Sequence, residues 1–241
     1  MAYEALIKSQ SFYTTMPQVC PYLPEQMERK IITLLEASNA EYLHNRLSQI
    51  GFRRSHSIAY LPLCIGCKAC VPIRIPVQTF LPTRTQKRIF KRNKDVQVNE
   101  VGLNATNEQY LLFKQYLNIR HPSGEMTEMD YEEYEAMITN TPITTFLLEF
   151  RLNNKKLIAV SLVDCIENGL SAVYTFYDPQ YNNRSLGCFS ILYLIEKAKF
   201  FNLPYLYLGY WIKASRQMAY KSQYKPAEIY IDSQWKLLDQ D

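Results

Sequence analysis

Glycine is scarce in this chain, which has 7 glycines among 241 residues. Neither GxGxxG nor GxxxxGKS/T occurs anywhere in the sequence. These loops need glycine because their backbone must come close to the phosphates of a bound nucleotide. The sequence therefore excludes the usual dinucleotide-binding fold and the P-loop fold.

Long apolar segments are absent as well. No run of 18 apolar residues occurs, although a membrane-spanning helix needs about 20. Residues 1–22 lack the apolar stretch of a secretory signal. We therefore expect a cytoplasmic protein that does not bind a membrane.

The remaining composition is that of a folded protein. Hydrophobic residues make up 47% of the chain, which allows a sizeable core and excludes wholesale disorder. The length fits one large domain or two small ones. The formal net charge is only +4, so overall charge does not by itself indicate a nucleic-acid partner, and DNA is not expected.

Cysteines cluster in one short segment. Cys64, Cys67 and Cys70 form a C-x2-C-x2-C pattern, and Cys20 is a candidate fourth ligand. Structural disulfides are rare in the cytoplasm, whereas thiolates at this spacing can share one metal. We interpret the four cysteines as a candidate zinc or iron–sulfur site, between which the spacing does not choose. Reduced cysteines packed against a proline-rich loop are the alternative.

Apolar spacing and turn residues predict the order of helices and strands. A first helix is predicted to begin at Pro24, and a second covers residues 38–50, with Ser38 and Glu41 spaced as a capping box. Further helices are predicted over 84–94, 106–120, 128–139, 187–201 and 215–221. Strands are predicted within 52–83 and over 143–151, 156–164, 170–177, 205–211 and 228–236.

This order of elements predicts an α+β fold. A meander of antiparallel strands is followed by strand, helix and strand, as in an N-acetyltransferase-like (GNAT-type) acyltransferase core. We place a smaller, cysteine-containing domain at residues 1–83 and the acetyltransferase-like domain at 84–241. In such a core, the helix after the fourth strand binds the phosphates of the acyl donor at its N-terminus.

The turn before that helix departs from the coenzyme A pattern. A pyrophosphate loop of that type reads R/Q-x-x-G-x-G/A, and Arg184 to Gly187 supply its first half. Phe189 then places a bulky side chain where the backbone must approach phosphate. The acyl-transfer frame is kept, whereas coenzyme A binding is disfavoured. An ordinary strand-to-helix turn is the alternative.

Basic residues gather where the two predicted domains meet. Residues 84–94 carry six lysines or arginines and no acidic residue, enough to neutralise several phosphates. Arg53, Arg54 and Arg74 add to this charge. We interpret the segment as an RNA-contacting surface, with a solvated helix face as the alternative. Aromatic residues and lysines at 208–211 and 218–226 fit a site for a base or a peptide, or ordinary packing.

Several of these segments occur together in one known family. They are Cys20-Pro-Tyr-Leu-Pro, Gly51-Phe-Arg-Arg-Ser, the cysteine pattern through Arg74, Arg120-His121, Tyr177-Asp178-Pro179, Ser185-Leu186-Gly187, Leu208-Gly209-Tyr210-Trp211 and Met218-x-Tyr220-Lys221. The combination resembles the arginyl/leucyl-tRNA–protein transferase family from Tyr13 to about Tyr230. The longer eukaryotic relatives carry Cys-x-x-Cys near the start, whereas position 23 is leucine here, so any cluster must be ligated differently.

The resemblance implies an acetyltransferase-like fold and an aminoacyl transfer. Its short bacterial form, with Cys-x-x-Cys-x-Ala-Cys, is similar to members that move leucine from leucyl-tRNA onto proteins with N-terminal Asp or Glu, which creates an N-degron. Arginine from arginyl-tRNA is the alternative donor. A coenzyme A-dependent N-acetyltransferase and a non-catalytic RNA-binding module are more distant alternatives. The transfer itself requires no cofactor.

We assign three groups of residues to this reaction. An arginine clamps the carboxylate of the acceptor's Asp or Glu through bidentate contacts, with Arg53, Arg54 and Arg74 as candidates. The tRNA acceptor end contacts Arg84, Lys87, Arg88, Lys91, Arg184 and Lys221. Asp178, with Tyr177 and His121, is the candidate reaction centre, as proton acceptor or amine positioner. Alternatively, Asp178 caps the turn that follows it. No Ser-His-Asp triad is evident.

Overall fold

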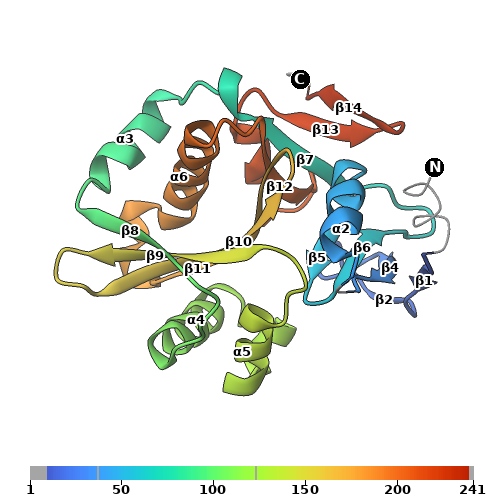
Figure 1. Cartoon of the computed structure of the whole chain (residues 1–241), viewed down its shortest axis with the longest axis horizontal. Helices are drawn as coiled ribbons and strands as arrows, with labels where there is room; N and C mark the ends of the chain where they lie inside the picture. The colour runs from blue at the N-terminus through green and yellow to red at the C-terminus, as the bar shows by residue number, and fades with distance from the viewer. Residues whose placement is uncertain (1–9, 37, 123, 239–241) are drawn as a thin grey trace.

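The computed structural model describes residues 10–36, 38–122 and 124–238. Its largest element is an eight-stranded sheet in the order β14-β13-β7-β12-β11-β10-β9-β8 (Figure 1). Its strands are β7 (Val71–Pro76), β8 (Val96–Val101), β9 (Thr145–Leu152), β10 (Leu157–Ile166), β11 (Gly169–Tyr177), β12 (Tyr205–Trp211), β13 (Glu228–Ile231) and β14 (Gln234–Leu237). All neighbours are antiparallel except β11 and β12. The chain has a mixed α/β fold built on a large mixed sheet.

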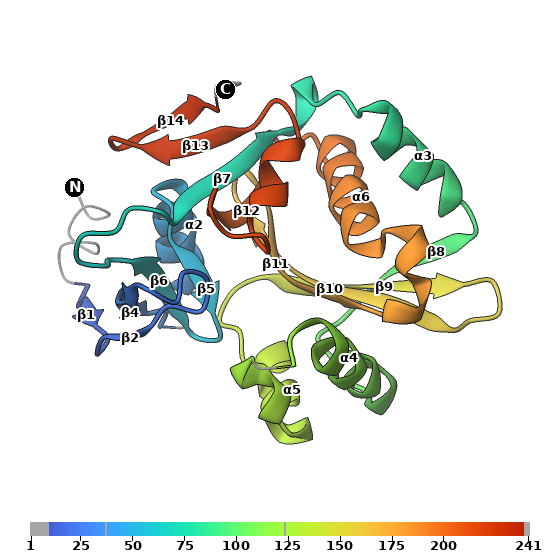
Figure 2. The same ribbon diagram turned by 180° about the vertical axis from the view of Figure 1, so that it is seen from behind.

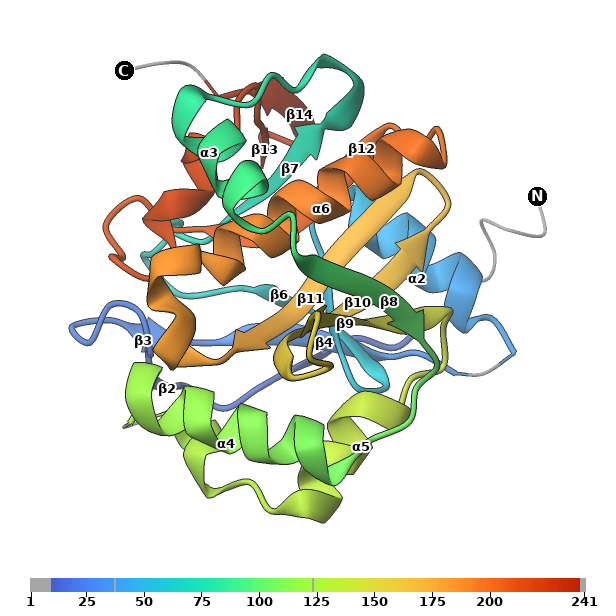
Figure 3. The ribbon, with the colours of Figure 1, turned by 90° about the vertical axis from the view of Figure 1, so that its left-hand side faces the viewer.

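Helices cover both faces of this sheet. α3 (Arg84–Arg92) and α6 (Leu186–Phe200) lie on one face, and α4 (Asn107–Arg120) and α5 (Tyr131–Thr139) lie on the other (Figure 3). The 3-10 turns are η1 (Val77–Thr79), η2 (Glu125–Glu128), η3 (Pro179–Arg184) and η4 (Ala219–Gln223). α6 is apolar on most sides because it packs between the sheet and α3. Within the described residues, no helix has the length and apolar character needed to cross a membrane.

A smaller four-stranded sheet lies at one end of the molecule, in the order β1-β4-β6-β5 (Figure 2). It consists of β1 (Tyr13–Thr14), β4 (Lys30–Leu34), β5 (Arg53–Ser55) and β6 (Ile58–Pro62); β2 (Gln18–Val19) and β3 (Met27–Glu28) form a separate ribbon. α2 (Ala40–Gln49) packs on it through Leu43 and Leu47. β7, the next strand along the chain, lies in the large sheet between β12 and β13. The division of the chain at residue 83 stays a prediction.

Many of the predicted elements are confirmed. The helices predicted over 106–120 and 187–201 are α4 and α6, and the strands predicted over 143–177 and 205–211 are β9 to β12. Thr106 and Gln109 form a reciprocal capping box, with bonds of 3.3 and 3.1 Å between each side chain and the other's backbone N–H. These elements are encoded by local patterns, which explains why they were predictable.

The helix predicted from Pro24 is wrong. This segment forms β3 and β4 instead, and β4 pairs with β6 from Lys30↔Pro62 to Leu34↔Ile58. Two isoleucines and a threonine give the segment β-branched side chains that suit a strand. The predicted capping box at Ser38 is also wrong, because Asn39 is the N-cap and makes no side-chain bond there. Glu41 instead accepts a bond from the hydroxyl of Thr144 at 2.6 Å.

Three other differences involve short elements. Residues 95–105, for which no element is predicted, contain β8. The single strand predicted over 228–236 is a hairpin, because Asp232 and Ser233 both take positive φ and reverse the chain. The helix predicted over 215–221 is the 3-10 turn η4, which begins only at Ala219.

Candidate active site

β11 and β12 lie side by side only at their beginnings. Their parallel pairing covers Gly169–Ser171 and Tyr205–Tyr207, although both strands continue for several residues. The register of β11 against β10 shifts at one point. Leu162 pairs with Tyr174 and the next residue, Val163, pairs with Ala172, so Val173 forms a bulge. Open sheets bind ligands beyond the carboxyl ends of their strands, where connections diverge. We refer to the region beyond Ser171 and Tyr207 as the strand opening.

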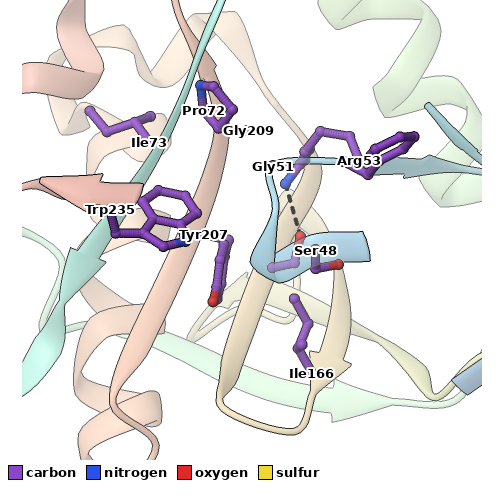
Figure 4. A pocket seen from close by; sticks show the side chains of 11 residues that line it. Ser48, Gly51, Arg53, Pro72, Ile73, Ile166, Tyr207, Gly209 and Trp235 are labelled. Carbon is purple, nitrogen blue, oxygen red and sulfur yellow. Dashed lines mark hydrogen bonds between the residues drawn. The ribbon is translucent and has the colours of Figure 1, made fainter. Parts of the chain in front are cut away.

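Arg53 of β5 lies at the start of the strand opening. Its Nη1 donates to Ser171 Oγ at 2.8 Å, and its Nη2 donates to the Ala172 carbonyl at 2.7 Å. Gly209 of β12 faces it, and a Cβ added there would stand 2.9 Å from Arg53 Nε. Gly209 also has φ +78°, which favours glycine. Arg53 and Gly209 both line a narrow pocket between α2, β7, β12 and β14 (Figure 4).

Arg54 is a buried structural cation. Its side chain is oriented away from solvent, and Nε and Nη2 donate to the two carboxylate oxygens of Asp164 at 2.8 and 2.7 Å. Thr145 donates a further bond to Asp164 Oδ1 at 2.9 Å. The bidentate edge of Arg54 is therefore occupied by a carboxylate of the chain itself, which ties β5 to β10.

Arg74 is paired in a similar way. Its Nε donates to Glu228 Oε2 at 2.7 Å, and its guanidinium lies 3.5 Å from the ring centroid of Tyr205 and 4.2 Å from that of Trp235. Of the three candidate arginines, only Arg53 contacts no carboxylate in the part of the chain that the structure describes. Arg53 is thus the one whose charge remains available to a ligand.

Lys221 of η4 lies inside the molecule. It is 7% exposed and donates from Nζ to the Tyr210 carbonyl at 2.7 Å. Burial, assisted by the positive charge of Arg53, lowers the pKa of Lys221 to about 7. This lysine, predicted to contact tRNA, is buried near the strand opening.

Tyr177 and His121 meet at a third residue, Tyr116 of α4. The ring centroids of Tyr116 and Tyr177 are 4.9 Å apart, and the Tyr116 hydroxyl lies 3.3 Å from His121 Nε2. Burial, with the charge of Arg120, lowers the pKa of His121, so its imidazole is neutral near pH 7. Sequence reasoning missed Tyr116; its position one turn before the Arg120-His121 motif is the signal that could have indicated it.

Asp178 is buried and already bonded on both carboxylate oxygens. Oδ1 accepts from the Gln180 N–H at 2.9 Å, which caps η3, and Oδ2 lies 3.0 Å from Lys156 Nζ. Gln115 Nε2 of α4 lies 3.4 Å from Oδ1. The structure therefore shows the capping arrangement. Asp178 and Tyr177 are adjacent in the chain but contact different side chains.

α3 presents the predicted basic surface. Arg84, Lys87, Arg88 and Lys91 are all exposed, and their spacing places them on one face of the helix. The opposite face is anchored by Ile89, by Phe90 against Phe189 (ring centroids 5.5 Å apart) and by a bond from Gln86 Nε2 to the Gln223 carbonyl of η4. We call the four cations the α3 basic face.

Arg184 does not belong to the α3 basic face. Its two terminal nitrogens donate to the carboxylate of Asp95 at 2.7 and 2.8 Å. Asn93 Nδ2 also donates to the Arg184 carbonyl at 3.0 Å. These bonds tie η3 to the end of α3 and neutralise the charge of Arg184.

The four clustered cysteines are free thiols, and Cys70 interacts electrostatically with the other three. Burial, followed by the charges of Cys20, Cys64 and Cys67, raises the pKa of Cys70 to about 12. Within the described residues, no group of three or more His, Cys, Asp or Glu is arranged to hold a metal ion. The zinc or iron–sulfur site predicted from the spacing is therefore not supported by this geometry, and we derive no step through a metal.

Comparison with known proteins identifies the family. The model described as Arginine-tRNA-protein transferase, C terminus, matches residues 108–231, and the model described as Arginine-tRNA-protein transferase, N terminus, matches residues 18–88. The aspartate/glutamate leucyltransferase of Gluconacetobacter diazotrophicus is 50% identical over 241 residues, which are 100% of this chain and 93% of that protein. Its namesake from Gluconobacter oxydans is 52% identical over 231 residues, 96% of each chain.

Solved structures add only a weak likeness. The C-terminal domain of a putative lysylphosphatidylglycerol synthetase from Agrobacterium fabrum has a TM-score of 0.47 and 11% identity, and the match covers 71% of this chain and 51% of that one. The family models and the curated relatives define the protein as an aminoacyltransferase enzyme. The chain belongs to the arginine-tRNA-protein transferase family, which confirms the resemblance seen in its motifs.

Proposed function

We propose that this protein moves leucine from leucyl-tRNA to the α-amine of cytoplasmic proteins with N-terminal Asp or Glu, and so creates an N-degron. Relatives that are about half identical over nearly the whole chain are named aspartate/glutamate leucyltransferases, which supports both the donor and the acceptor. The observation that carries the acceptor part is Arg53, a cation at the strand opening whose hydrogen-bond partners among the described residues are all neutral. An acidic acceptor side chain would supply the carboxylate that this arginine lacks.

The charges around the strand opening favour leucine as the donor amino acid. An arginyl group would need a free carboxylate, but Asp164 is bound to Arg54 and Asp178 is bound to Lys156. Arg53 and Lys221 would also repel a second guanidinium. Tyr177, half-buried at the end of β11, offers aromatic surface instead. An arginyl-tRNA donor remains the alternative.

Positioning supplies most of the rate enhancement in this proposal. An N-terminal amine has a pKa of about 7.7–8.0, so roughly a fifth is already neutral near pH 7.3 and full deprotonation is worth only about 1 kcal/mol. Holding the amine against the ester is worth ~7–11 kcal/mol. The amine nitrogen forms a bond to the leucyl carbonyl carbon, the ester C–O bond breaks, and the ribose hydroxyl leaves with a proton.

We assign the proton transfer to His121, supported by Tyr116 and Tyr177. The imidazole is neutral near pH 7 because burial and Arg120 lower its pKa, so one ring nitrogen can accept the proton that the attacking amine loses. Tyr116 holds the ring from one side. Asp178 then acts through the chain, because capping η3 fixes the end of β11 that carries Tyr177.

The α3 basic face is the proposed contact for the tRNA acceptor stem. Its four exposed cations match a phosphate backbone, and the Gln86–Gln223 bond ties the helix to η4, next to the strand opening. The order β11, α6, β12 supports an acetyltransferase-like (GNAT-type) core, in which the acyl group enters between those two strands. The aminoacyl end of the tRNA would follow α3 towards η4 and reach Tyr177.

The structure does not favour a coenzyme A-dependent acetyltransferase. Phe189 is 3% exposed and packs against Phe90 and Phe150, where a pyrophosphate loop would need a small residue. Arg184, which would contact the pyrophosphate, is bound to Asp95. Both observations indicate that the turn before α6 connects strand and helix and does not bind a pyrophosphate.

A donor assay tests the proposal. The purified protein is incubated with leucyl-tRNA, arginyl-tRNA or acetyl-coenzyme A, each labelled in the group to be transferred, and a peptide that begins with Asp. We expect label in the peptide from leucyl-tRNA only. Label from arginyl-tRNA would keep the family and overturn the donor, and label from acetyl-coenzyme A would overturn the function.

A further inference from the structure

We propose that Lys221 and Arg53 together bind the side-chain carboxylate of the acceptor, so that Lys221 determines specificity for acidic N-termini. This inference deepens the proposed function and rests on it. It moves Lys221 from the group of tRNA contacts to the acceptor site.

Each of these two cations is held by a main-chain carbonyl of one of the diverging strands. Arg53 donates to the Ala172 carbonyl of β11 at 2.7 Å, and Lys221 donates to the Tyr210 carbonyl of β12 at 2.7 Å. Gly209, the residue before Tyr210, is the one that makes room for Arg53. The two side chains therefore approach the same part of the strand opening from β5 and from η4.

Neither cation has an anionic partner in the described part of the chain. The ligands of Arg53 are a hydroxyl and a carbonyl, and the ligand of Lys221 is a carbonyl. Two titratable groups act on the pKa of Lys221: Arg53 lowers it, and Cys70, from the segment before β7, raises it. A buried cation without a counter-charge is costly, and the low pKa of Lys221 reflects that cost. A bound carboxylate would relieve it.

The occupant is better explained as a carboxylate than as a phosphate. Lys221 is only 7% exposed, so a phosphodiester would have to be buried with its sugar to reach it. The carboxylate of an N-terminal Asp or Glu sits on a short side chain and needs less space than a phosphodiester. Phosphates have the exposed α3 basic face available to them. The two kinds of anion are thus separated on the molecule.

The test compares Lys221→Met and Lys221→Arg with Lys236→Met, at an exposed lysine of β14, as the control. Peptides that differ only in Asp or Asn at the N-terminus are the acceptors. For Lys221→Met we expect at least a tenfold loss of the Asp-over-Asn ratio of kcat/KM, through the KM of the Asp peptide. Lys221→Arg restores most of this ratio, Lys236→Met leaves the ratio unchanged, and the KM for leucyl-tRNA stays unchanged in all three variants.

Two results would overturn the inference. An unchanged Asp-over-Asn ratio with a higher KM for leucyl-tRNA would return Lys221 to the tRNA site, and an unchanged ratio with a lower melting temperature would make it structural. Where Asn peptides react too slowly, N-acetylated Asp and Asn peptides are used as inhibitors. The ratio of their inhibition constants then replaces the ratio of kcat/KM. Failure of the proposed function looks different, because the wild-type protein would then transfer no leucine to Asp peptides.

Discussion

Position 209 requires glycine because the Arg53 side chain packs closely against it. Its φ is positive, and a Cβ at this position would stand only 2.9 Å from Arg53 Nε, which leaves no room for a side chain. We therefore expect Gly209→Ala to displace Arg53, to lower stability by about 1–3 kcal/mol and to weaken the preference for Asp over Asn acceptors. Gly102→Ala is the control, because a Cβ there meets nothing within 4 Å. Equal effects of both substitutions would contradict this expectation.

His44 couples stability to pH. It is 2% exposed and its Nδ1 has no hydrogen-bond partner, and burial is the main cause that lowers its pKa to about 4. Between pH 6.5 and 4 the unfolded chain binds a proton at this residue that the folded chain does not bind. The free energy of unfolding should therefore decrease as the pH is lowered from 6.5 to 4, by about 3 kcal/mol in total.

Chemical denaturation at several pH values measures this dependence. In His44→Gln the slope between pH 6.5 and 4 should flatten, because the titrating group is gone. If the variant and the wild-type protein lose stability in parallel over that window, another group causes the loss.

At the scale of elements, the sequence predicted the helices and strands that are encoded by residues close together in the chain. The Thr106–Gln109 capping box defines α4, and period-2 alternation with the Asn168-Gly169 turn defines β10 and β11. β4 was missed because its partner β6 lies about thirty residues away, and the spacing of its apolar residues also suits a helix. Pairing between distant segments does not appear in a local pattern.

The candidate site also contains features that the sequence predicted and features that only the fold reveals. Motif spacing predicted that Tyr177, His121, Arg53 and Lys221 matter, and the structure brings the first two together at Tyr116. Sequence could not distinguish Arg53 from Arg54, because the distinction depends on Asp164 of β10, more than a hundred residues away. The assignment of Lys221 to tRNA came from its charge alone, and its burial only becomes visible in the fold.

The pair Arg54–Asp164 is predicted to join β5 to β10. Arg54→Ala would leave the Asp164 carboxylate buried without its partner, which typically costs about 3–5 kcal/mol. We expect a large drop in melting temperature, with Asp-over-Asn preference retained in the folded fraction. For Arg53→Ala we expect the reverse: the melting temperature stays close to that of the wild-type protein, and the Asp-over-Asn preference is lost. A stable Arg54→Ala that loses this preference would identify Arg54 as the acceptor's ligand.

The α3 basic face is predicted to act through phosphates. Replacing Lys87 and Lys91 by alanine should raise the KM for leucyl-tRNA and reduce the slope of log K against log salt by about 0.9 for each phosphate that is no longer neutralised. Lys236→Ala, at the sheet edge formed by β14, is the matched control. Steady-state kinetics between low and moderate salt make the measurement, and an unchanged slope in the double variant would refute the assignment.

At the scale of the whole molecule, segments far apart in the chain contribute residues to the proposed site. β5 provides Arg53, α4 provides Tyr116, β11 ends in Tyr177, and η4 provides Lys221. The large sheet holds them together because β7 crosses into it from the side of the smaller sheet. These residues come from both stretches that the family models match, 18–88 and 108–231.

The central claim is that this site joins leucine to acidic N-termini. The most direct measurement mixes the wild-type protein with labelled leucyl-tRNA and an equimolar set of peptides that begin with Asp, Glu, Asn or Lys, and reads the label on each product. We expect leucine on the Asp and Glu peptides, with the others at least tenfold lower. Leucine spread evenly over the set, or found mainly on the Lys peptide, would contradict the claim.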